Sequence, residues 1–126
     1  MPEVQEAGRL RSWIVMWLTR AGLGHLADDL TLIASELAAN ALVHGGGPAR
    51  ADVRIADRAG PPPRVRLEVT DLGRGFDLDA VVRTWEDSGG MLDGCRGRGL
   101  FIVAELSHRW GVRRDRGGHT VWAELG

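Results

Sequence analysis

The sequence contains no lysine: all sixteen basic residues of this 126-residue chain are arginines. This excludes a Walker-type P-loop, because that phosphate-binding loop needs its lysine. A single cysteine, Cys95, excludes an internal disulfide and fits a reducing compartment, so we expect a cytoplasmic location. No apolar run is long enough to span a bilayer, and no signal-peptide pattern opens the chain. Because the net charge is only −1, no global field attracts nucleic acid. We therefore expect neither a membrane nor a nucleic-acid partner.

The composition is that of an ordinary soluble domain, with 44% apolar and 26% charged residues. A chain of this length can bury one hydrophobic core but not two, so we expect residues 1–126 to form one domain.

Helical periodicity marks three segments of the chain. Apolar residues at helical spacing predict a first helix over residues 3–21. A second helix is predicted to begin at an N-cap, Asp28 or Asp29, and to end at His44, where three glycines follow. A third is predicted over residues 100–107.

Alternating apolar and polar residues mark four strands. Residues 53–55 and 65–69 are predicted to pair as a hairpin across a proline-rich turn. Residues 110–114 and 119–125 are predicted to form a second hairpin. Residues 77–96 are rich in glycine and weakly periodic, which favours a mobile loop with a short helix over 81–85.

The first candidate site motif lies on the second helix. Glu36, Asn40 and His44 are four residues apart and so lie in one row, beside the apolar stripe. A partly desolvated carboxylate and amide need partners. Either they are a polar helix edge, or Asn40 supplies an oxygen to Mg²⁺ and Glu36 polarises or deprotonates a nucleophile. His44 by itself is best interpreted as a structural histidine.

The second motif follows the strand that ends at Asp71. This carboxylate shares parity with Val69 and so points to the apolar side of the sheet, where it needs a hydrogen-bond donor. An adenine amino group would be one. Gly73 and Gly75 leave room for a flat base, and Phe76 packs beneath it. The alternative is an ordinary turn that ends a strand.

The third motif surrounds the start of the third helix. Gly97, Gly99 and Leu100 lie where unpaired backbone amides favour phosphates, and Arg96 or Arg98 could add a charged contact. The alternative is a glycine-rich linker.

These motifs together, in this order and spacing, resemble the ATPase domain of the gyrase, heat-shock chaperone, histidine kinase and mismatch-repair (GHKL) superfamily. The similarity covers nearly the whole chain and is strongest to the bacterial anti-sigma-factor serine/threonine kinases. It implies a two-layer α/β (α+β) sandwich, the Bergerat fold, with about three helices on one face of a mixed sheet. It also implies ATP and Mg²⁺ as cofactors. By the same resemblance Glu36 is the catalytic base and Asn40 the magnesium ligand. The implied nucleotide contacts are Asn40, Asp71, Gly73, Gly75, Phe76, Arg96, Gly97, Arg98, Gly99, Leu100 and Thr120, the last as a second adenine-side contact.

The resemblance also assigns residues 77–96 to the ATP lid, which would contain Trp85, while we expect Trp13, Trp17 and Trp122 in the core. Members of the family usually begin with a strand, which this sequence lacks before its first helix. Either the start of the sequence was trimmed or misassigned, or the sheet has an open edge that could receive a partner or a second copy.

The function that the resemblance implies is an ATP- and Mg²⁺-dependent serine/threonine protein kinase that regulates transcription as an anti-sigma factor. Its partners would be a sigma factor, a small anti-anti-sigma (STAS-like) protein, or both. The alternative is a non-catalytic, ATP-gated protein-binding module.

Overall fold

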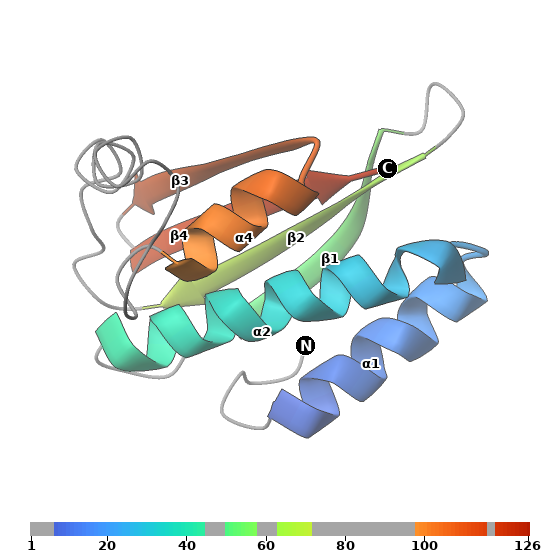
Figure 1. The fold of residues 1–126 in the computed structure, drawn as a ribbon, viewed down its shortest axis with the longest axis horizontal. Helices are drawn as coiled ribbons and strands as arrows, with labels where there is room; N and C mark the ends of the chain where they lie inside the picture. Colours follow the sequence, from blue (N-terminus) through green and yellow to red (C-terminus); the bar gives the residue numbers. More distant parts are fainter. Residues whose placement is uncertain (1–6, 45–49, 58–62, 72–97, 116–117) are drawn as a thin grey trace.

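The computed structural model describes residues 7–44, 50–57, 63–71, 98–115 and 118–126. These form two layers, with helices on one side and an antiparallel sheet on the other (Figure 1). In chain order the elements are α1 (Ala7–Arg20), the 3₁₀ turn η1 (Gly24–Leu26), α2 (Ala27–His44), β1 (Arg50–Asp57), β2 (Arg64–Asp71), α4 (Arg98–Leu106), β3 (Arg109–Asp115) and β4 (Gly118–Leu125).

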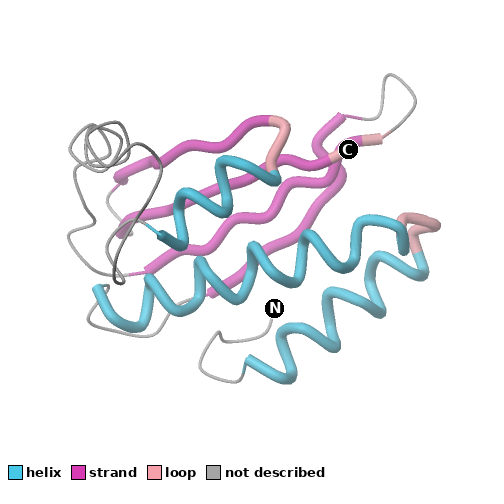
Figure 2. The backbone as a smooth tube through the Cα atoms, in the orientation of Figure 1, coloured by secondary structure: helices cyan, strands magenta, loops and turns pink. Residues whose placement is uncertain are grey.

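The sheet has the strand order β1-β2-β4-β3, and every pairing among the described strands is antiparallel. Both predicted hairpins are present, β1 with β2 and β3 with β4. The two-layer α+β sandwich is confirmed, but the expectation of a mixed sheet is wrong for the strands described. The reason is topological: β2 and β4 are neighbours in the sheet (Figure 2), and their pairing is antiparallel.

The core lies between α2 and the inner face of the sheet. Leu30, Ile33 and Leu37 of α2 and the alternate residues Val65 and Leu67 of β2 are all at most 2% exposed. α2 contacts β2 and β4 as well as both other helices, so it is the central element of the helical layer. Strand side chains alternate between the two faces of the sheet. The residues between the buried ones therefore lie on the face that points away from the helices, the open face.

α1 ends in a Schellman motif. Gly22 has φ +75°, its amide donates to the carbonyl oxygen of Thr19 at 3.2 Å, and the Leu23 amide donates to that of Leu18 at 2.8 Å. Leu18 and Leu23 are both buried. The chain therefore reverses within a few residues, and α1 packs beside α2.

The start of α2 differs from the prediction. Asp28 and Asp29 do not cap the helix from outside but lie within its first turn, because η1 leads directly into Ala27. There their carboxylates face the positive end of the helix dipole. The predicted end at His44 is confirmed.

Two of the three tryptophans expected in the core are placed there. Trp13 and Trp17 pack against the core cluster. Trp122 instead lies on the open face of the sheet, because its Cα partner in β2 is Glu68, not a buried residue. The predicted lid and short helix, and any strand before α1, lie outside the described residues.

Candidate functional site

The ends of four elements meet at one end of the molecule (Figure 1). The carboxyl end of α2 and the amino end of α4 lie there, together with the carboxyl end of β2 and the amino end of β4. The candidate residues described by the structure therefore come from segments that are far apart in the sequence.

Glu36, Asn40 and Gly99 are brought together between α2 and α4. A Cβ placed at Gly99 would lie 2.9 Å from Glu36 Oε2, 3.2 Å from Asn40 Nδ2 and 3.5 Å from Asn40 Oδ1. Only glycine fits this position without displacing those side chains. The carboxylate and the amide of the first motif thus lie directly against the first turn of α4, as a joint site requires.

Asp71 lies at the end of β2 on the inner face of the sheet and is 6% exposed. Its Cα partner across the sheet is His119 of β4, and His119 Nδ1 is 3.6 Å from Asp71 Oδ2. His119 is itself 2% exposed. His119 is not among the residues that the sequence motifs predicted for the site. The signal was available, since His119 shares parity with the apolar residues Val121 and Ala123.

Thr120 does not lie beside Asp71. It occupies the next register position, so its side chain points to the open face, where its Oγ1 is hydrogen-bonded to Thr70 Oγ1 at 2.8 Å. The resemblance implied that Thr120 is a second adenine-side contact. The residue beside Asp71 is His119, because strand residues alternate between faces, and the adenine-side role of Thr120 stays a prediction.

The remaining candidates are described in part or not at all. Leu100 is 3% exposed and belongs to the core, so it could contact a ligand only through its backbone. Arg98 begins α4, but its side chain is not described, and neither is that of His44. Five further candidates lie outside the described residues: Gly73, Gly75, Phe76, Arg96 and Gly97.

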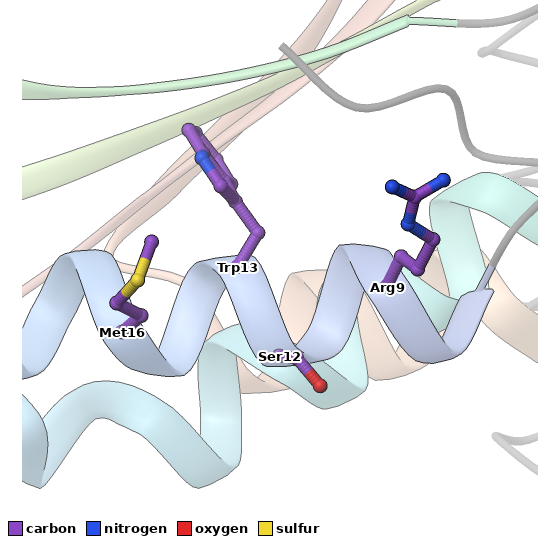
Figure 3. A pocket seen from close by; sticks show the side chains of 4 residues that line it. All are labelled: Arg9, Ser12, Trp13 and Met16. Atoms are coloured by element: carbon purple, nitrogen blue, oxygen red, sulfur yellow. The ribbon is translucent and has the colours of Figure 1, made fainter.

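A hollow of about 360 Å³ on the surface of α1 is separate from this site. Figure 3 shows its lining: Arg9, Ser12, Trp13 and Met16. All four belong to one helix. Among the residues that the structure describes, the lining therefore offers no polar groups converging from several elements, as a nucleotide site needs.

The residues present fit a nucleotide with a divalent cation. Gly99 leaves open the space next to Glu36 and Asn40 that a Cβ would fill, and the first amides of the nine-residue helix α4 begin there. Within the described segments, no group of three His, Cys, Asp or Glu side chains could hold a metal ion. A magnesium ion held by Asn40 would take its other ligands from phosphate and water oxygens, which is the usual coordination of that ion.

The fold and the site together define an α+β domain with a polar site where the helix and strand ends meet. Comparison with protein families identifies the chain: residues 2–125 match the histidine kinase-like ATPase domain, so it belongs to that family. Domains of this family bind ATP.

No curated protein matches the sequence. A solved structure that is similar is the histidine kinase domain of the blue-light activated histidine kinase from Erythrobacter litoralis EL346. It is 21% identical, with a TM-score of 0.49. The match covers 97% of this chain and 59% of that one, so this chain spans less than two thirds of the relative's length. Among the helices that the structure describes, none is long and apolar enough to cross a membrane.

Proposed function

We propose that this protein is an ATP- and Mg²⁺-dependent serine/threonine protein kinase whose substrate is a small regulatory protein of the anti-anti-sigma class. In the same proposal it inhibits a sigma factor by binding it. The observation that carries the kinase assignment is the position of Glu36, whose carboxylate lies beside Asn40 and the first turn of α4. A domain that only bound nucleotide would need Asp71 and the glycines but no carboxylate there.

Each described site residue has a role in this reaction. The Asp71 carboxylate accepts a hydrogen bond from the amino group of the base, and His119 lies beside it. Asn40 supplies an oxygen ligand to the cation. Glu36 accepts the proton of the attacking serine or threonine hydroxyl as its oxygen forms a bond to phosphorus. Bound Mg-ATP supplies the phosphoryl group and leaves as ADP.

Paired substitutions in α2 separate the two roles. Glu36→Gln keeps the shape and hydrogen-bonding capacity of the side chain but removes the base. It should leave Mg-ATP affinity within a few-fold and lower phosphoryl transfer by about 10²–10⁴, the usual contribution of a positioned base. Asn40→Ala should lower both the affinity measured in magnesium and the turnover.

The assay is transfer of radiolabelled phosphate to the partner protein, with ATP hydrolysis measured in parallel. If the unsubstituted protein binds ATP tightly but shows neither activity with its partner present, the kinase proposal fails. A non-catalytic, ATP-gated binding module would then be the better account. Equal transfer by Glu36→Gln and the unsubstituted protein would contradict the role of Glu36 alone.

A further inference from the structure

The face of the sheet that points away from the helices carries a concentration of arginine. By strand register, six arginines lie on it whose side chains the structure describes: Arg50, Arg54, Arg64, Arg66, Arg109 and Arg113. Three carboxylates with described side chains accompany them: Asp52, Glu68 and Glu124. Asp57 and Asp115 pair with Arg64 and Gly118 in the same register, so the formal charge of this face by register is +1, whereas that of the whole chain is −1. We call these residues, with Trp122, the open sheet face.

Two of the carboxylates are each shared between arginines. Glu68 accepts from Arg54 at 3.2 Å, from Arg66 at 2.8 Å and from Arg113 at 3.3 Å. Glu124 accepts from Arg66 at 2.9 Å and from Arg109 at 3.0 Å. Four guanidinium groups thus surround two carboxylates.

The arginines fall into an inner and an outer group. Arg66 is 15% exposed and lies 4.1 Å from the centre of the Trp122 ring, between the two glutamates. The side chains of Arg54 and Arg109 are 60% exposed and that of Arg113 is 49% exposed. The network therefore orients exposed cationic groups from β1 and β3 around a common centre.

Trp122 is held in place at that centre. A Cβ at Gly111 would lie 2.7 Å from Trp122 Cζ2 and 2.9 Å from Nε1, so the ring lies directly against the β3 backbone, where only glycine leaves room. Tryptophan and arginine are the residue types that contribute most to binding free energy at protein interfaces. Here both are fixed before any partner arrives, which lowers the entropy lost on binding.

We propose that the open sheet face is a docking surface for an acidic surface of a partner protein. Guanidinium groups bind carboxylates with paired hydrogen bonds, and the exposed groups of Arg54, Arg109 and Arg113 carry the sign of charge that such a partner complements. A second copy of this chain fits poorly, because a two-fold dimer would place the same positive surface against itself. Nucleic acid also fits poorly, because the chain has an isoelectric point of about 6.4 rather than a basic one.

The size of the surface indicates a transient complex. Four strands of seven or eight residues cover about 19 by 24 Å at ordinary strand spacing and rise, or ~450 Å². A stable interface buries about 800 Å² on each partner. The surface therefore suits a complex that forms and dissociates readily, and charge should raise its association rate more than its affinity.

The test uses a fluorescently labelled polyglutamate peptide as the acidic probe and measures anisotropy on the full chain at low ionic strength. The combined variant Arg54→Gln, Arg109→Gln and Arg113→Gln removes three exposed charges and keeps Arg66 and both glutamates. The matched control, Arg9→Gln, Arg11→Gln and Arg20→Gln, removes three exposed charges from α1. Circular dichroism and thermal melts establish that both variants fold.

The proposal predicts that the sheet variant loses about tenfold in affinity for the peptide while the α1 variant stays within about twofold. Binding should weaken with added salt and persist in saturating ATP. It should also shift the indole N–H resonance of Trp122. Equal losses in the two variants, or resonance shifts confined to the helices, would overturn the docking surface. So would tighter binding of a short DNA duplex to the same face, or a dimer that only the sheet variant dissociates. None of these outcomes depends on Glu36 or phosphoryl transfer, so the kinase proposal stands or falls separately.

Discussion

Gly99→Ala should abolish most of the activity of this domain at little cost in stability. The added methyl group would lie 2.9 Å from Glu36 Oε2 and 3.2 Å from Asn40 Nδ2. Both atoms are at the ends of flexible side chains, so the side chains rather than the two helices will move. An off-rotamer glutamate costs about 0.5–1.5 kcal/mol. Replacing glycine by alanine inside a helix gains up to about 1 kcal/mol. The two effects nearly cancel, and we expect the free energy of unfolding to stay within ~1 kcal/mol.

The effect on chemistry is larger because catalysis depends on position more steeply than folding does. A displacement of about 1 Å in a catalytic group can lower a rate by 10². We therefore expect ATP turnover and phosphoryl transfer to fall by about two orders of magnitude. Gly24→Ala is the matched control, because a Cβ there would approach nothing closer than Thr19 Oγ1 at 4.0 Å.

Urea denaturation and a coupled ATPase assay on the unsubstituted protein, Gly99→Ala and Gly24→Ala test the predicted stability and the predicted loss of activity. If Gly99→Ala hydrolyses ATP at the unsubstituted rate, the space beside Glu36 and Asn40 is not part of the reaction site. If it loses several kcal/mol of stability, the assumption that the side chains move before the helices is wrong.

Three further predictions concern the sheet. Asp71→Asn should weaken ATP binding by one to two decades, since a charged hydrogen bond in a desolvated pocket contributes roughly 1.5–3 kcal/mol; calorimetry giving equal affinities would contradict the adenine assignment. Thr120→Val should cost about 1 kcal/mol of stability through the lost hydrogen bond to Thr70 but leave ATP affinity unchanged, whereas His119→Gln should weaken ATP binding; the reverse order in calorimetry would favour Thr120 as the adenine-side contact. Burial alone would raise the pKa of Glu124, but hydrogen bonds and charge from Arg66 and Arg109 outweigh burial and hold it below its ordinary value. The carboxylate therefore stabilises the fold above its unfolded pKa and loses that contribution as the pH falls through its folded pKa. The stability difference between the unsubstituted protein and Glu124→Gln should shrink as the pH drops below about 4.3, and a difference independent of pH in denaturant titrations would refute it.

Much of the architecture could be predicted from the sequence, because a helix or strand with one buried face has apolar residues at regular intervals. The stripe that contains Leu30, Ile33 and Leu37 located α2 and put Glu36 and Asn40 along its edge. Alternation located both hairpins and correctly placed Asp71 on the inner face. The start of α2 was missed because either aspartate is a good N-cap by residue type, and η1 occupies the place where a cap would stand.

Only the tertiary structure decided which residues meet. Sequence spacing could not show that Gly99 lies against Glu36 and Asn40. α2 and α4 are far apart in the sequence and come into contact only when the chain folds. Parity with Val121 and Ala123 marks His119 rather than Thr120 as the inward-facing residue, but it does not show what His119 faces. The register of β4 with β2 decides that His119 lies beside Asp71. The same alternation puts Trp122 among the arginines of the open sheet face instead of in the core.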